Sequence, residues 1–178
     1  NDSALIAFRM PQTEEPKGFH ISAAHAASPT FKVKESPEMA VEGAYLKLNT
    51  EKYGGAILST WLDRPLSVAG RMVVRGKSEI ETRLVNIEKD LLVIPNVAVH
   101  MNHDLNKGFE YNLQTDMLPL YGECGNGKKG SVFLRRLAKY AGVKQEDILG
   151  HDLFLYVRDR GRVLGEGGEL VLSPRLED

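Results

Sequence analysis

The side chain best placed for metal chemistry in this sequence is His25, which follows an apolar stretch and precedes a turn. Residues 18–24 have the composition of a β-strand, and Pro29 disfavours helix just after the histidine. Strand ends are where α/β enzymes commonly keep their ligands. His25 is therefore a candidate metal ligand, and the alternative is a histidine that only forms hydrogen bonds within its loop.

Several other segments occur in an order that resembles one enzyme family. They are HAASP at 25–29, FKVK at 31–34, ILSTWLDRPLSVAG at 57–70, IPNVAVH at 94–100, NLQTDMLP at 112–119 and SPRLED at 173–178. Together these motifs are similar to those of the aspartyl aminopeptidases, and the match at 57–70 is specific. The resemblance covers nearly the whole chain, which would correspond to a middle portion of a full-length family member.

The resemblance implies a site with two zinc ions that share a carboxylate. By this resemblance His25 would bind one zinc ion, and Glu177 or Asp178 would supply the bridging carboxylate. Such cations lower the pKa of a bound water and make it a nucleophile near neutral pH. His100 would contact substrate in the active site of a neighbouring subunit, and its alternative is a strand-end histidine bonded to backbone. The implied activity is a metallo-aminopeptidase that removes N-terminal, often acidic, residues from peptides.

Two positions depart from the family's motifs. Ala27 stands where the family has an aspartate that orients the metal-binding imidazole, and Glu177 stands where it has the bridging aspartate. Loss of a partner that orients a ligand costs ~10–100-fold in metal affinity or activity. The family's remaining ligands would lie beyond residue 178, so these residues alone are expected to form an incomplete site. A non-catalytic assembly subunit that keeps only the oligomerisation surface is the alternative function.

The implied fold is an α/β metallopeptidase domain, a central mixed sheet flanked by helices, with an inserted β-rich dimerisation domain. Residues 1–35 and 149–178 would belong to the peptidase domain, and residues 36–148 to the insertion. Subunits of the family assemble through dimers into a tetrahedral dodecamer that encloses the active sites. The expected partners are therefore peptides and other copies of this chain.

The elements themselves can be predicted from composition and periodicity. Apolar runs bounded by turn residues predict strands at 3–10, 18–24, 30–34, 43–48, 66–75, 80–87, 91–94, 151–156 and 169–172. Residues 131–140 predict an amphipathic helix that stops before Gly142, and residues 143–149 predict a second short helix. Residues 102–129 and the glycine-rich segment 161–168 predict loops.

Some conspicuous side chains have structural interpretations. Trp61 is expected at an interface rather than in a core, because the family's inserted domain makes oligomer contacts. Asp63 and Arg64 are expected to form an ion pair or hydrogen bonds that stabilise a turn. His151 is expected to open a strand and cap a turn.

Composition narrows the class of protein. The chain has 178 residues, 42% of them hydrophobic and 26% charged, which is typical of a folded soluble domain. The formal net charge of −1 provides no broad positive field, so nucleic acid is not an expected partner. No apolar run reaches the roughly 20 residues needed to cross a membrane. The single cysteine, Cys124, excludes an intrachain disulfide framework, and a cytoplasmic location is expected.

Overall fold

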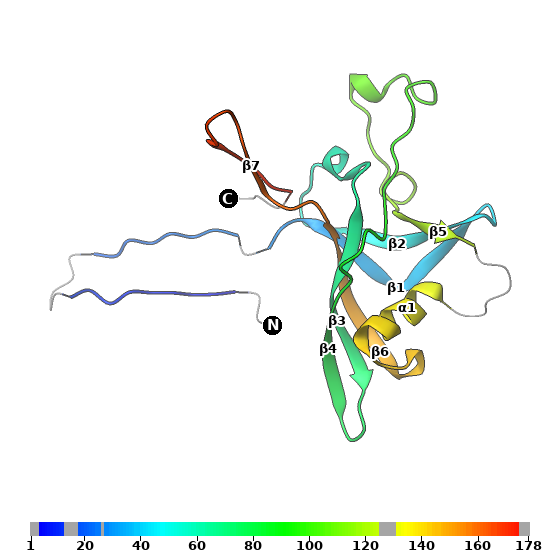
Figure 1. Cartoon of the computed structure of the whole chain (residues 1–178), viewed down its shortest axis with the longest axis horizontal. Helices are drawn as coiled ribbons and strands as arrows, with labels where there is room; N and C mark the ends of the chain where they lie inside the picture. Colours follow the sequence, from blue (N-terminus) through cyan, green and yellow to red (C-terminus); the bar gives the residue numbers. More distant parts are fainter. Residues whose placement is uncertain (1–3, 13–17, 26, 125–130, 175–178) are drawn as a thin grey trace.

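Six antiparallel strands form the sheet at the centre of the computed structural model, in the order β4-β3-β6-β1-β2-β5 (Figure 1). The structure describes residues 4–12, 18–25, 27–124 and 131–174. The sheet strands are β1 (Thr30–Val41), β2 (Tyr45–Tyr53), β3 (Leu66–Arg75), β4 (Ile80–Asn86), β5 (Leu120–Glu123) and β6 (Ile148–Val157). A separate hairpin pairs β7 (Arg162–Leu164) with β8 (Leu170–Leu172). Strands from opposite ends of the chain, β1 and β6, therefore lie side by side in the middle of the sheet.

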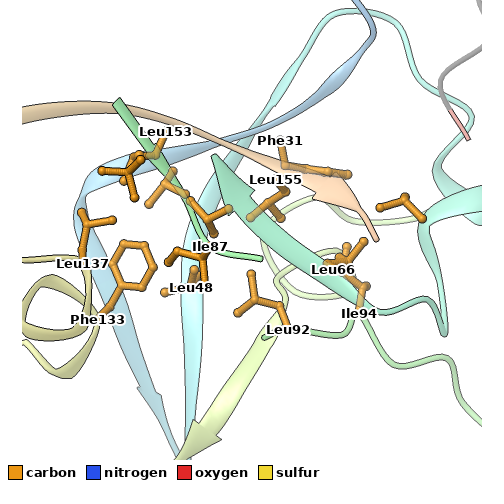
Figure 2. Packing of buried hydrophobic residues seen from close by; sticks show 14 of the residues in the cluster. Phe31, Leu48, Leu66, Ile87, Leu92, Ile94, Phe133, Leu137, Leu153 and Leu155 are labelled. Atoms are coloured by element: carbon orange, nitrogen blue, oxygen red, sulfur yellow. The ribbon is translucent and has the colours of Figure 1, made fainter. Parts of the chain in front are cut away.

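The hydrophobic core lies on one face of this sheet. Successive side chains of a strand point to opposite faces, so alternate residues of β3 and β6, such as Val68 and Leu155, are buried together. Helix α1 (Val132–Ala141) covers this face and contributes Phe133 and Leu137. Figure 2 shows these two side chains pointing toward the apolar residues of the strands. The alternating pattern of the central strands thus produces one continuous core.

The ends of helix α1 are fixed by side chains predicted to flank it. Ser131 is the N-cap and accepts a hydrogen bond from a backbone N–H group of the first turn, and Gly142 ends the helix with a φ of 67°. The carboxylate of Glu38 in β1 accepts hydrogen bonds from the first two N–H groups of the helix. A negative charge at this end is favourable because helix N-termini carry partial positive charge. The helix predicted at 131–140 is confirmed.

The strands predicted at 3–10 and 18–24 are wrong for the part that the structure describes. Residues 4–12 and 18–25 contain no strand, and their apolar side chains are exposed; Phe8 is 82% exposed and Phe19 is 92% exposed. A strand needs a neighbour to take its backbone hydrogen bonds, and no described strand pairs with these segments. Apolar composition alone therefore misassigned them.

Other elements differ from their predictions in smaller ways. The run predicted as a strand at 91–94 forms isolated bridges to Leu62, Leu66 and Leu120 in place of a strand. The expected loop at 102–129 contains β5, and the glycine-rich segment at 161–168 contains β7 and the hairpin turn. The second predicted helix is a short 3-10 turn, Gln145–Asp147.

Trp61 belongs to the core and not to an exposed surface, contrary to the prediction. It ends a 3-10 helix, Leu58–Trp61, is 8% exposed and contacts Phe31 edge to face with ring centroids 5.1 Å apart. Edge-to-face contacts of this kind add roughly 0.5–1.5 kcal/mol to the effect of burial. Trp61 therefore anchors the start of the 57–70 signature against β1.

The predicted domain boundaries fall at or near strands of one sheet. Residue 35 lies inside β1 and residue 149 inside β6, and both strands belong to the sheet that also contains β2 to β5. The sheet thus contains residues assigned to both predicted domains. The β-rich character of the central part is confirmed. The division into a peptidase domain and an inserted dimerisation domain stays a prediction.

Gly70 in β3 provides a test of how closely the central strands must approach. A Cβ atom at this position would overlap the carbonyl oxygen of Asp152 in β6. We therefore expect Gly70→Ala to destabilise the chain by roughly 1–3 kcal/mol in chemical denaturation. Gly150, on the same strand pair, would place its Cβ in open space, so Gly150→Ala is the matched control and should be neutral or slightly stabilising. Equal stabilities of the two variants would contradict this account.

Candidate functional site

The predicted ligand His25 lies at the end of the extended segment 18–25 that leads toward β1. Its side chain is exposed. The other two predicted ligands, Glu177 and Asp178, lie outside the described residues. A zinc site made of all three is therefore not tested by the structure and stays a prediction.

The topology nevertheless brings the flanking segments to one end of the sheet. Strands β1 and β6 are antiparallel, with Lys32 opposite Phe154. The start of β1, which follows His25, therefore lies at the same end of the sheet as the end of β6, which leads to the β7–β8 hairpin and Ser173. In Figure 1 the segment 18–25 and this hairpin project from the same side of the sheet.

A set of side chains joins these two strands, and we call it the β1–β6 seam: Thr30, Lys32, Asp152, Phe154 and Leu155. The hydroxyl of Thr30 donates to the carbonyl of Leu155 at 2.5 Å, and Lys32 Nζ lies 3.0 Å from Asp152 Oδ1. The hydrogen bond from Lys32 lowers the pKa of Asp152, and the same bond raises the pKa of Lys32. Because both side chains are partly exposed, solvent weakens this ion pair. The main effect of the Lys32–Asp152 ion pair is therefore to fix the alignment of β1 with β6.

The second predicted site residue, His100, lies on an exposed turn at the end of the segment 94–100. The 57–70 signature holds the start of that segment. The backbone N–H of Asp63 donates to Ile94 O at 2.9 Å, and Asp63 Oδ1 accepts from the backbone N–H of Asn96 at 2.9 Å. Leu62 also forms a parallel bridge with Ile94. The signature therefore acts here as a clamp that positions the turn carrying His100.

The geometry explains why the signature has Asp63 at this point. Asp63 has a φ of 56°, in the left-handed region where aspartate and asparagine are favoured among non-glycine residues. Its predicted role in stabilising a turn is confirmed. Arg64 does not pair with it but lies 3.9 Å from Asp159, beyond the end of β6.

Sequence reasoning missed a hollow of about 390 Å³ beside the turn of His100. Its lining includes Val97, Met101, Leu105 and the edge-to-face pair Phe109 and Tyr111. Leu105, Phe109 and Tyr111 lie in the segment predicted as a loop, and Val97 and Met101 lie just before it, so no periodic pattern marked these apolar side chains. The hollow lies next to the turn that carries His100, and its apolar lining gives the surface beside this turn an apolar character.

The described residues do not by themselves provide a complete metal site. In ranges 4–12, 18–25, 27–124 and 131–174, no three histidine, cysteine, aspartate or glutamate side chains are grouped as metal ligands. The side chain of Ala27 offers no hydrogen-bond acceptor that could orient the imidazole of His25. Of the predicted zinc ligands, the described residues include one, the exposed imidazole of His25. A zinc ion would need further ligands to bind there tightly.

Comparison with known sequences gives a consistent result over the full length of the chain. The family model described as "Aminopeptidase I zinc metalloprotease (M18)" matches residues 1–178. The "Probable M18 family aminopeptidase 2" of Clostridium acetobutylicum is 50% identical over 182 residues, covering 100% of this chain and 42% of the relative. The protein of the same name from Pseudomonas paraeruginosa is 35% identical with the same coverage. The chain thus spans less than half the length of these curated relatives.

Solved structures agree with the sequence matches. The chain resembles a protein in the "Cryo-EM structure of the Ape4 and Nbr1 complex", with a TM-score of 0.79, 32% identity and coverage of 86% of this chain and 33% of that one. It also resembles the S. cerevisiae mApe1 dodecamer, with a TM-score of 0.65, 25% identity and coverage of 85% and 34%. The predicted family is therefore confirmed: this chain belongs to the M18 family of zinc metalloprotease aminopeptidases.

Proposed function

We propose that the whole protein to which these residues belong is a metal-dependent aminopeptidase that removes N-terminal residues, preferably acidic ones, from peptides. The observation that carries this proposal is the family match along all 178 residues, together with relatives that are named aminopeptidases. The sheet supports it because β1 and β6 direct the segment of His25 and the segment that precedes Glu177 to one end of the fold.

The proposed division of roles follows the sequence. His25 and one of Glu177 and Asp178 act as zinc ligands, with further ligands from the rest of the protein. A zinc pair bound there would supply a water of lowered pKa as the nucleophile. Large apolar side chains are exposed on residues 4–12 and 18–25. This chain covers only 42% of the length of its relative, and we propose that further residues of the whole protein bury these side chains.

His100 is proposed to act on substrate bound in a neighbouring subunit. It lies on an exposed turn, and the clamp of Asp63 and Asn96 holds the base of that turn. A related structure is a dodecamer, which supports self-association of this protein into dimers and a dodecamer. The apolar hollow beside the turn would face the same neighbour.

The peptidase is favoured over a non-catalytic assembly subunit. The two relatives compared above match along 100% of this chain and are named aminopeptidases.

The cytoplasmic location remains a proposal that rests on the single cysteine. Among the described residues, no helix is long and apolar enough to span a membrane.

The activity can be tested on the full-length protein. Loaded with zinc, it should release N-terminal aspartate or glutamate from short peptides faster than leucine, and a chelator should abolish release. His25→Ala should lower both bound zinc and activity, whereas Ala27→Asp should raise metal affinity ~10–100-fold because it supplies an acceptor for the imidazole. Zinc content is measured alongside rates. A zinc-loaded protein that releases no N-terminal residue from any peptide would refute the proposal.

The role of His100 in a neighbouring subunit predicts complementation. His25→Ala and His100→Ala proteins should each be nearly inactive, but co-expression in equal amounts should restore activity to on the order of a quarter of the wild-type sites, since subunits assemble randomly. A restored site combines His25 of one subunit with His100 of another. If the mixture is no more active than its components, His100 does not act across the interface.

The clamp can be tested separately from catalysis. In this chain Asp63→Ala should cost about 1–2 kcal/mol of unfolding free energy, because it removes an acceptor and places alanine at a left-handed φ. Asp63→Asn keeps the acceptor and tolerates this φ, so it is the matched control and should cost less. Hydrogen exchange at the Asn96 amide should speed up about tenfold in the alanine variant. Unchanged exchange at Asn96 would mean that Asp63 does not hold the turn.

A further inference from the structure

His151 occupies an unusual place in the middle of the sheet. The prediction that it opens a strand and caps a turn is wrong, because it lies inside β6, opposite Met72 of β3. It has the same strand parity as the buried residues Leu153 and Leu155, so its ring points to the core face. Both ring nitrogens are buried, and neither has a hydrogen-bond partner among the residues that the structure describes.

Among the described residues, β1 and β6 are paired in register at one position, three residues along β6 from His151. Strand β1 lies next to β6 at Lys32, opposite Phe154, and its register with β2 shifts between Val33 and Glu38. The irregular stretch contains Glu35, which is exposed. His151 therefore lies at the end of the β1–β6 seam, where one flank of β6 loses regular pairing.

This environment favours the neutral imidazole. Burial lowers the pKa of His151 below its ordinary value, and Lys32 acts in the same direction. The carboxylates of Glu35 in β1 and Asp152 in β6 oppose burial without overcoming it. On the β3 side Met72 is the residue opposite His151, while the adjacent Arg71 pairs with Asp152. A buried cation without a partner is costly, so a proton can be accepted only if the ring gains water or a carboxylate.

We propose that His151 makes the β1–β6 seam sensitive to acid: protonation of this buried ring below neutral pH weakens the seam and loosens the alignment of β1 with β6. The consequence for activity rests on the proposed function, because the seam aligns the segments that carry His25 and the terminal acidic pair. The effect on the fold itself does not depend on it.

The direction of the effect follows from linkage. The folded-state pKa lies below the unfolded value near 6.5, so the folded state binds the proton less well than the unfolded state. The stabilising contribution is complete above pH of about 6.5 and is lost as the pH falls from there through the folded-state pKa. One such group changes the folding equilibrium by up to about tenfold per pH unit within this window.

The decisive experiment compares unfolding of the 178-residue chain across this pH range. Wild type, His151→Gln and the control His103→Gln, which removes an exposed histidine, are denatured chemically at pH 7.5 and 5.0. His151→Gln should lose less stability on acidification than wild type, whereas His103→Gln should behave like wild type. A wild-type pH dependence in His151→Gln would overturn the proposal.

Two measurements keep the test decisive if His151→Gln folds poorly. Titration of the wild-type ring by NMR should give a pKa below 6.5, and Glu35→Gln should lower it further by removing a negative charge that favours the protonated ring. Hydrogen exchange, corrected for the intrinsic effect of pH, should show the amides of Phe154 and Leu155 opening more readily at pH 5.0. A ring that titrates at 6.5 or above, or a seam unchanged by acid, would exclude the proposed role. Neither readout depends on peptidase activity.

Discussion

The antiparallel contact of β1 with β6 is the constraint on which the rest of the structure depends. The Thr30–Leu155 hydrogen bond joins residues 125 positions apart and brings an early strand next to a late one. Closing so long a loop has an unfavourable conformational entropy that other interactions must offset. Burial of apolar side chains on the core face of β3, β6 and β1 offsets this entropy. The Lys32–Asp152 ion pair, on the opposite face of the sheet, favours the observed register. Apolar burial therefore holds the strands together, while polar contacts decide which residues face each other.

In this fold, the residues that hold the scaffold together are different from the residues expected to touch metal or substrate. The 57–70 signature is the most specific motif in the sequence, yet these of its residues have structural roles in the described chain: Trp61 packs in the core, Asp63 holds a turn, and Gly70 permits close approach to β6. A motif can thus identify a family strongly without containing its reactive groups. The residues expected to touch metal or substrate, His25 and His100, lie instead on exposed segments that this scaffold orients.

Sequence reasoning succeeded where a single element carries its own signals and failed where the outcome depends on a distant partner. Helix α1 was predictable because Ser131, Gly142 and its apolar face are local, and β3 was predictable because its apolar run is bounded by turn residues. The segments at 4–12 and 18–25 have equally apolar sequences, but no described strand pairs with them. The burial of Trp61 and the position of His151 inside β6 likewise depend on which strand lies opposite, which a single sequence does not specify. His25 and His100 were identified by resemblance, whereas the hollow beside His100 is built by side chains without a periodic pattern.

Ala27 is the departure with the clearest chemical consequence for the proposed metal site. An imidazole that binds zinc through one nitrogen usually donates a hydrogen bond from the other, and the acceptor fixes the tautomer and raises ligand basicity. The side chain of Ala27 cannot supply that acceptor, so in this chain the orientation of His25 must come from backbone groups, from its other contacts or from the rest of the protein. The alignment of β1 then carries more weight than it would with an aspartate present, since β1 is the rigid element nearest to His25 along the chain. Any condition that loosens the β1–β6 seam would accordingly affect His25, a proposed ligand whose neighbouring side chain at position 27 gives it no support.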